Sequence, residues 1–275
     1  MNKILLILNG EEMSEAAILY AANFAKENQG LVHAYFLKPL GTGAEMYHFN
    51  FGEPFINLNE EFDIPNSKNL KNNIKRFKHI CTEHKVNFTI HNDDGDTAVN
   101  LMDESIFADF IVTDHNTSMS NLISGMSASF LEHLLTESHC PVFIVPQQFQ
   151  PIQNLILAYD GEASSTRAIK LFSYLFSELT ALPTTLFSVN KNHSNHLKFN
   201  KKIKSLIENQ YPNSRFKVLR DNRKDIFVNE LIKAPKNHCV ILGSYGGNSL
   251  SRMFVHSMID DILSKTQLPV FVSHF

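Results

Sequence analysis

The stretch Leu155-Ile-Leu-Ala158-Tyr159-Asp160-Gly161 is a short apolar run that ends in an acidic residue and a glycine, and a helical pattern follows it from Ser164 to Leu179. The start of the chain has the same order, because Ile4-Leu-Leu-Ile-Leu8 ends at Asn9-Gly10 and precedes a helical pattern. Strand–turn–helix units of this kind are typical of α/β proteins with a parallel sheet. The two units predict two related halves.

Further matches support a tandem duplication. Ala17-Ile18 recurs as Ala168-Ile169, Val99-Asn100 as Val228-Asn229, and Pro141-Val-Phe143 as Pro269-Val-Phe271. The spacing between matched residues falls from 151 to 128 along the chain, so the first half carries an insertion of about 23 residues. We place the two domains at 1–147 and 151–275, and the insertion at 39–67. It is rich in aromatics and is expected to pack on the protein or to cover a ligand.

Each half alternates strand-like apolar runs with amphipathic helical stretches. We therefore predict an α/β fold of two tandem, doubly wound, five-stranded parallel-sheet domains. The predicted strands lie near 3–9, 31–37, 87–92, 109–114 and 141–146, and then near 153–159, 184–190, 215–220, 238–243 and 269–274. The predicted helices lie near 14–27, 67–85, 97–107 and 126–138, and then near 164–179, 197–210, 225–234 and 256–265.

The composition excludes several classes of protein. With 275 residues, 43% hydrophobic and 19% charged, the chain is neither disordered nor fibrous. Three cysteines without CxxC spacing exclude a disulfide framework, and no apolar run approaches the ~18 residues of a membrane span. We expect a cytoplasmic protein with no membrane or nucleic-acid partner. Residues 1–150 carry a net charge of −10 and residues 151–275 a net charge of +7. This asymmetry is consistent with attraction between the halves, with an anionic ligand in the second half, or with ordinary solvated surfaces that differ in charge.

A glycine-rich turn follows the fourth predicted strand of the second half. Gly243, Gly246 and Gly247 come directly after the apolar run that ends at Leu242, and a predicted helix begins about ten residues later. Ligands of open α/β sheets bind outside the carboxyl ends of the strands. Backbone N–H groups in such a turn, together with a helix N-terminus, can hold phosphate groups. The pattern indicates a phosphate-binding turn.

These residues resemble the universal stress protein (UspA) family, whose fold is of the adenine nucleotide alpha hydrolase type. ATP-binding members carry Gly-x-x-Gly, nine residues and Gly-Ser/Thr, with an Asp at the end of the first strand. Here Gly243-Ser-Tyr-Gly246 is followed by nine residues and His256-Ser257, and Asp160 ends the first strand. The terminal Leu268-Pro-Val-Phe-Val272 also resembles the family pattern, and the likeness covers essentially the whole chain.

The resemblance implies an adenine nucleotide, with Mg, in the second half. Asp160 would bind the ribose or adenine edge, Val189 would contact the base, and Ser257 would help the glycine turn hold the phosphates. His256 replaces the family's glycine, and it would either pair with phosphate when protonated or block the pocket. The implied site comprises Ala158, Tyr159, Asp160, Val189, Leu242, Gly243, Gly246, His256, Ser257 and Met258.

The first half departs further from the pattern. Asn9 replaces the aspartate, Phe36 is expected near the base position, and His115 and Ser118 are aligned with the two turn glycines. We expect a degenerate site with a structural role. The sequence identifies no catalytic residues and no metal ligands, so hydrolysis of ATP would be weak at most.

We therefore expect a stress-response binding protein that takes ATP in its second domain. The alternative is a protein without a nucleotide that acts through contacts with unknown protein partners. The resemblance also implies that the last strands of the two domains pair, which makes the chain an internal pseudo-dimer; a further homodimer is possible.

Overall fold

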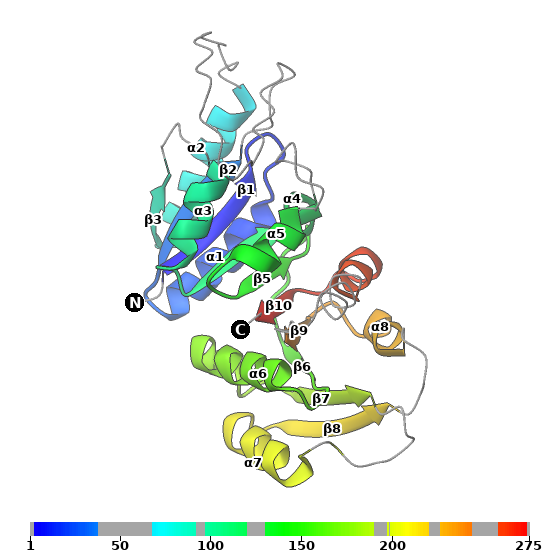
Figure 1. Cartoon of the computed structure of the whole chain (residues 1–275). Coiled ribbons are helices and arrows are strands. Elements are labelled where there is room, and N and C mark those ends of the chain that lie inside the picture. Colours follow the sequence, from blue (N-terminus) through cyan, green and yellow to red (C-terminus); the bar gives the residue numbers. More distant parts are fainter. Residues whose placement is uncertain are drawn as a thin grey trace, which may run out of the picture.

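A computed structural model describes residues 3–37, 68–91, 97–119, 130–189, 197, 199–219, 226–243 and 258–273. The predicted insertion at 39–67 lies outside these residues. The described strands form one ten-stranded sheet in the order β3-β2-β1-β4-β5-β10-β9-β6-β7-β8 (Figure 1). Their bounds are β1 Lys3–Asn9, β2 Leu31–Leu37, β3 Asn87–Ile90, β4 Phe110–Asp114, β5 Val142–Val145, β6 Asn154–Ala158, β7 Thr184–Val189, β8 Ser214–Leu219, β9 His238–Gly243 and β10 Val270–Ser273.

The sheet confirms the predicted edge-to-edge pairing of the last strands. Neighbouring strands are parallel except β5 and β10, which run antiparallel with Phe143 opposite Phe271. Strands β1–β5, which we call the first half, and β6–β10, the second half, have the same internal order on either side of this pair. Pairing leaves neither β5 nor β10 with an open edge, so their backbone N–H and C=O groups find partners within the chain.

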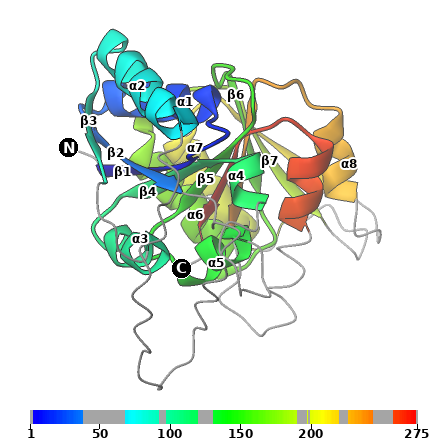
Figure 2. The same cartoon turned by 90° about the horizontal axis from the view of Figure 1, so that it is seen from above.

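Helices cover both faces of the sheet, as a doubly wound fold requires (Figure 2). One apolar core includes residues of α1, α2, α6 and α7, and the other includes residues of α5, α8 and the helix over 258–265. The helices are α1 Glu15–Glu27, α2 Lys68–Glu83, α3 Thr97–Ser105, α4 His115–Met119, α5 Phe130–Glu137, α6 Ala163–Leu175, the 3₁₀ turn η1 Ser177–Leu179, α7 Asn200–Gln210 and α8 Ile226–Ile232.

The strands are apolar on both faces because both faces are covered. In β1, Ile4, Leu6 and Leu8 belong to the core under α1, whereas Leu5 and Ile7 belong to the opposite core. All five side chains are inaccessible to solvent. This burial explains why the run 4–8 is continuously apolar rather than alternating.

An aromatic cluster joins the two halves. Phe176, at the end of α6, packs its ring within 4.9 Å of Phe24 of α1 and 4.9 Å of Phe110 of β4, measured between ring centroids. Phe143 and Phe271, from the paired strands, contact the same ring at 5.5 and 5.8 Å. The first apolar core is therefore continuous across the junction, and each half buries part of the other.

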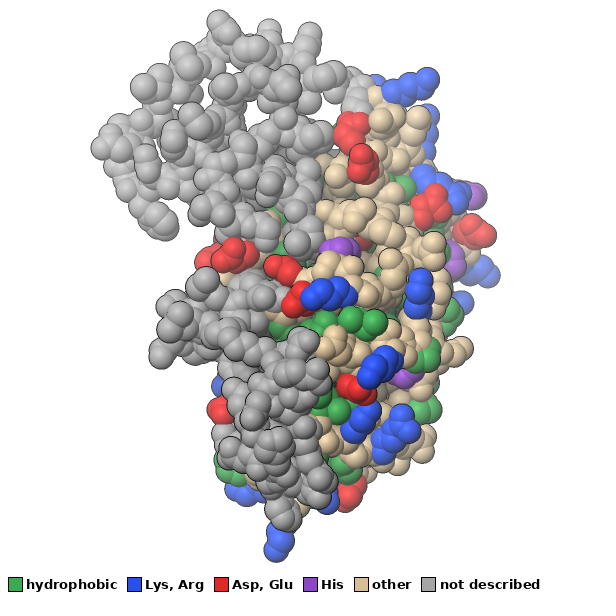
Figure 3. Space-filling view, turned by 90° about the vertical axis from the view of Figure 1, so that its right-hand side faces the viewer, with side chains coloured by type: hydrophobic (Ala, Val, Ile, Leu, Met, Phe, Trp, Pro, Cys, Tyr) green, Lys and Arg blue, Asp and Glu red, His purple; other side chains and the backbone are tan. Residues whose placement is uncertain are grey.

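Charged side chains of both signs are interspersed on the side of the molecule that carries α8 (Figure 3). In the second half, Glu230 of α8 forms ion pairs with both Lys217 and Lys233. The opposite net charges of the two halves are therefore not separated into single-sign surfaces among the described residues of this side.

Candidate functional site

In the second half, the order in which the strands follow one another across the sheet reverses between β6 and β9. The chain leaves β6 towards β7 on one side and returns to β9 on the other, so the connections diverge at the carboxyl ends of these two strands. Asp160 lies two residues beyond the end of β6, and Gly243 is the last residue of β9. The topology brings these two predicted site residues to the point where open α/β sheets bind ligands.

The Asp160 carboxylate is exposed and held in place by its own turn. Its Oδ1 accepts hydrogen bonds from the backbone N–H of Glu162 at 2.9 Å and from the hydroxyl of Ser165 at 2.7 Å. Gly161 between them has φ of 84°, which favours glycine. Ser165 belongs to the first turn of α6, so the carboxylate is fixed relative to that helix.

Gly243 is required by a close approach that the sequence did not indicate. A Cβ at this position would lie 2.4 Å from the carbonyl carbon of Ser164 and 2.4 Å from the backbone nitrogen of Ser165. Only glycine lets the end of β9 pass this close to the first turn of α6. The glycine therefore has a packing role, whether or not a phosphate also binds there.

Most of the other predicted site residues pack into or against the core at the carboxyl ends of the strands. Ala158, Val189 and Met258 are partly buried and pack against the second apolar core, and Leu242 lies within it. Tyr159 is buried and donates its backbone N–H to the carbonyl of Phe187 at 2.8 Å. Burial raises the pKa of the Tyr159 phenol, and the charges of Asp160 and Glu162 act in the same direction. Gly246, His256 and Ser257 lie outside the described residues.

The strand register corrects the expected alignment of the first half. Phe143 faces Phe271, Asp114 of β4 pairs with Val145, and Gly243 of β9 pairs with Ser273. These pairs put Asp114, and not His115, in the position of Gly243. The same spacing of 129 relates Val99 to Val228, so the alignment based on the proline motifs was one residue out. Thr117, rather than Ser118, then matches Gly246.

Asp114 fills the position that glycine occupies in the second half. The carboxyl group is 1% exposed, and its Oδ1 accepts from the backbone N–H groups of Asn116 at 3.0 Å and Thr117 at 3.2 Å. Its Oδ2 accepts from the Thr117 hydroxyl at 2.5 Å, and the Gln147 amide donates to Oδ1 as well. The residues predicted as a degenerate turn thus form a short helix, α4, capped by this carboxylate.

His115 is the first residue of α4 and is half-buried. Burial lowers the pKa of its imidazole, while the charges of Asp114 and Asp260 act in the opposite direction. Asp260 belongs to the helix over 258–265, which lies beside α4 (Figure 2). The charge of a second-half residue therefore reaches the first residue of α4, in the half that was expected to have a degenerate site.

Asn9 keeps the turn geometry of Asp160 without its charge. Its Oδ1 accepts from the backbone N–H of Glu11 at 2.9 Å and of Glu12 at 3.2 Å. The register pairs Asn9 with Leu37, so Leu37 and not Phe36 stands beside it. Phe36 instead points into the core under α2, with its ring 5.8 Å from that of Phe77. The expectation that Phe36 lies at the base position was wrong, because the side chain faces the other side of β2.

Solved structures resemble this chain over nearly its full length. A universal stress protein from Archaeoglobus fulgidus DSM 4304 matches with a TM-score of 0.67 at 16% identity, covering 99% of this chain and 96% of that one. The chain has the universal stress protein fold. A functionally unknown protein from Pseudomonas aeruginosa PAO1 matches with a TM-score of 0.59 at 12% identity, covering 100% and 92%. No protein-family model and no curated protein matches.

The three cysteine thiols of this universal stress protein fold are buried. Burial raises the pKa of the Cys81 and Cys140 thiols to about 12, and it raises that of Cys239 as well. These thiols are protonated at neutral pH and are not nucleophiles. In the described part of the chain, no group of three His, Cys, Asp or Glu could hold a metal ion, and no helix could span a membrane.

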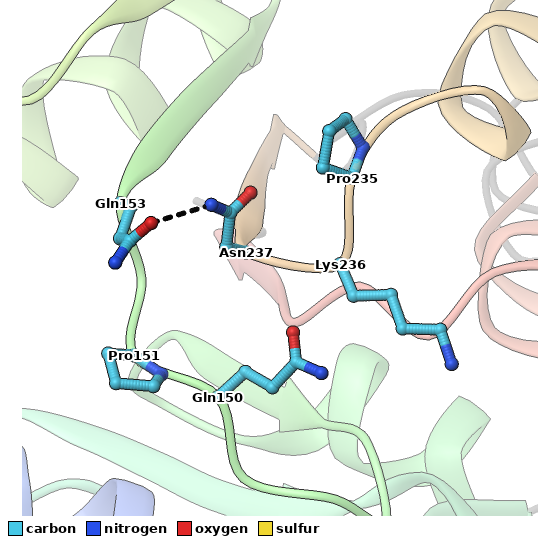
Figure 4. Close-up of a pocket in the computed structure, with 6 residues that line it drawn as sticks. All are labelled: Gln150, Pro151, Gln153, Pro235, Lys236 and Asn237. Atoms are coloured by element: carbon cyan, nitrogen blue, oxygen red, sulfur yellow. Dashed lines mark hydrogen bonds between the residues drawn. The ribbon is translucent and has the colours of Figure 1, made fainter.

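An open hollow of about 390 Å³ lies at the other end of the strands (Figure 4). Its lining comes from the segment that joins the halves and from the turn before β9. Across it, the side-chain N–H of Asn237 donates a hydrogen bond to Gln153 Oε1 at 2.7 Å. These residues precede β6 and β9, whereas Asp160 and Gly243 lie at the carboxyl ends. The hollow is therefore separate from the candidate site.

Proposed function

We propose that the chain is a regulatory binding protein of the universal stress protein type, with one adenine-nucleotide site, at the carboxyl ends of β6 and β9. The observation that carries this proposal is the contrast between equivalent positions of the two halves. The second half has an exposed, fixed carboxylate at Asp160 and a glycine at 243, whereas the first has Asn9 and a buried carboxylate at Asp114. The likeness to solved universal stress proteins supports a role in a stress response.

In this proposal the main residues of the site bind different parts of the nucleotide. The Asp160 carboxylate accepts hydrogen bonds from ribose or adenine, and Val189 packs against the base. Backbone groups at Leu242, Gly243 and Gly246, with Ser257, bind the phosphates of a nucleotide that carries Mg. The Asp160 carboxylate is assigned to the nucleoside, and no residue is given a catalytic role.

Charge supports a single site per chain. A triphosphate is strongly anionic, and the buried Asp114 carboxylate stands where the first half would have to receive it. A phosphate placed next to this carboxylate would be repelled by it. The second half has the uncharged Gly243 at the matching position, so the second half is the favourable one.

Replacement of Asp160 by alanine is expected to weaken the binding of Mg-ATP about 10- to 100-fold, because hydrogen bonds to a charged group contribute about 1.5–3 kcal/mol. Asn9→Ala removes the equivalent side chain of the first half and is the matched control, which should leave the affinity unchanged. Asp160→Asn keeps an acceptor for Glu162 and Ser165 and so separates loss of charge from loss of the turn. Titration with a fluorescent ATP analogue measures the affinity of wild type and of these three variants. Equal affinity of wild type and Asp160→Ala would refute the site.

Replacement of His256 by glycine distinguishes the two roles left open for this residue. If the imidazole obstructs the phosphates, the variant binds Mg-ATP more tightly than wild type at every pH. If a protonated imidazole pairs with phosphate, the variant binds more weakly, and the difference grows as the pH falls through about 6.5. Affinities measured between pH 5.5 and 8 decide between them.

A second candidate function is a protein without nucleotide that acts through protein contacts. The close approach of Gly243 to Ser164 and Ser165 favours it, because packing alone then explains this glycine of the motif. Under this alternative, Asp160→Ala and wild type both fail to bind Mg-ATP. The function would then lie in the protein's surfaces, and partners would have to be sought by cross-linking.

A further inference from the structure

The basic residues of the first half are concentrated on one helix. Residues 68–85, which comprise α2 and the turn after it, contain six of the nine lysines and arginines of residues 1–150 but only one of the nineteen acidic residues. The stretch therefore has a net charge of +5 within a region whose total is −10. A local surface of one sign in a region of the other sign favours a partner whose own charge is equally local.

Four lysines form a stripe along α2. Spacings of three and four residues place them on the same side of the helix over about 15 Å, and all four side chains are exposed. This basic stripe consists of Lys68, Lys71, Lys75 and Lys78. Among the lysines and arginines of α2, only Arg76 forms an ion pair with another described residue, Glu15 of α1. The charge of the stripe is therefore not balanced by an ion pair within the described part of the chain.

Half-buried apolar side chains border the basic stripe. Ile74 lies one helical turn from Lys71 and from Lys78, and Phe88 belongs to β3, beside α2. Both pack against the first core and remain partly accessible. Because β3 ends the sheet on this side among the described strands, the border lies at the edge of the sheet. A partner that fits this surface combines carboxylates with an apolar centre.

The chain itself carries a surface of that composition at the end of α3. The run Asp103-Glu-Ser-Ile-Phe-Ala-Asp109 contains three carboxylates and two large apolar side chains. Ile106 and Phe107 are 55% and 71% exposed. The Ser105 hydroxyl oxygen accepts from the backbone N–H of His139 at 2.8 Å, which brings the end of α5 to the same place.

The carboxylates around these two apolar side chains are mostly unbalanced. Lys3 pairs with Glu104, whereas Asp103, beside Ile106 and Phe107, and Glu137, at the end of α5, are exposed. We call this surface the acidic patch. It consists of Asp103, Ile106, Phe107, Asp109 and Glu137.

The basic stripe and the acidic patch lie on opposite faces of the sheet. Figure 2 shows α2 on one side of the outer strands and α3 on the other, and Phe77 of α2 and Leu101 of α3 belong to different cores. A copy of the chain turned over by a two-fold axis presents its acidic patch to the basic stripe, and its own basic stripe can then receive the acidic patch of the first copy. Such an interface is closed, as in most homodimers.

We propose that two copies of the chain associate in this way, with the basic stripe of each against the acidic patch of the other. Complementary charge and apolar content within one chain favour a second copy as the partner. The total charge of −3 opposes self-association only weakly. A nucleic acid or an anionic membrane extends its charge far beyond the stripe and would be repelled by the acidic remainder of the first half. The interface does not involve the candidate nucleotide site, so it stands or falls independently of that site.

Sedimentation velocity of the full chain tests the interface. At about 50 mM salt a dimer is expected to form as the protein concentration rises to about 100 μM, and its dissociation constant should increase about tenfold at about 500 mM salt, because salt screens exposed charges. Reversing two charges of the stripe, in Lys75→Glu/Lys78→Glu, should weaken the dimer at least about tenfold. Lys201→Glu/Lys202→Glu alters the total charge equally on α7, where both lysines are exposed, and is the matched control that should leave the dimer intact.

A charge exchange tests whether the two surfaces meet. Asp103→Lys/Glu137→Lys, which reverses the acidic patch, should also be monomeric under these conditions. An equimolar mixture of this variant with Lys75→Glu/Lys78→Glu should form the dimer again, because each basic surface then faces an acidic one in both contacts. All of these residues are exposed, and circular dichroism establishes that the variants are folded.

Three results would overturn the proposal. A wild-type chain that stays monomeric up to about 200 μM at low salt has no such interface. A dimer that persists in Lys75→Glu/Lys78→Glu uses another surface. Two variants that are monomeric alone and remain so when mixed would show that the basic stripe and the acidic patch do not contact each other.

Discussion

Phe176→Ala is expected to lower the free energy of unfolding by about 3–5 kcal/mol, the usual cost of deleting a fully buried aromatic ring. Phe176 is 1% exposed, and its ring contacts Phe24 and Phe110 of the first half as well as Phe271 of the second. The cavity would open where the two halves meet. Urea denaturation of the full chain, followed by circular dichroism, measures the effect.

Phe199→Ala is the matched control, because this ring is 60% exposed and its removal should cost little. The substitution at Phe176 should also uncouple the halves, so that the denaturation curve broadens or splits into two transitions. A loss below about 1 kcal/mol for Phe176→Ala would contradict a continuous core across the junction.

Gly243→Ala is expected to destabilise the protein by an amount near the upper end of the about 1–3 kcal/mol range for overpacking. The added methyl group would meet the backbone of Ser164 and Ser165 at 2.4 Å, and backbone cannot move aside as a flexible side chain can. The end of β9 or the first turn of α6 must shift. Because Asp160 Oδ1 accepts from the Ser165 hydroxyl, the shift should reach the proposed nucleotide site as well.

Thermal and chemical denaturation of Gly243→Ala test the packing role, and titration with Mg-ATP tests the effect on the site. Alanine for glycine at an unstrained position usually stabilises a protein by about 0.4–1 kcal/mol. A variant more stable than wild type would therefore show that β9 does not approach α6 this closely.

Most of the architecture could be predicted from the sequence because it rests on local patterns. Continuous apolar runs such as 4–8 mark strands buried on both faces, and the ten predicted strands agree with the observed ones within a few residues. The pairing of β5 with β10 was instead implied by the family resemblance, and it is confirmed by the register of Phe143 with Phe271. The domain boundaries stay predictions.

The details of the site depended on longer-range geometry, and there the sequence was insufficient. A spacing of 128 between the proline motifs suggested His115 as the match of Gly243, but the register of β4 gives Asp114. One residue of slip moves a side chain to the other face of a strand, which is also why Phe36 was misplaced. The close contact of Gly243 with α6 involves residues about 80 positions apart, and no local pattern indicates it.

Calorimetric titration of the purified full chain with Mg-ATP, at physiological salt, tests the central claim most directly. The proposed contrast between Asp160 with Gly243 and Asn9 with Asp114 predicts saturable binding at one site per chain. Two sites per chain would show that the buried Asp114 carboxylate does not exclude nucleotide from the first half. No heat and no thermal stabilisation up to about 1 mM ATP would contradict a nucleotide site altogether, since a ligand that binds the folded state must stabilise it.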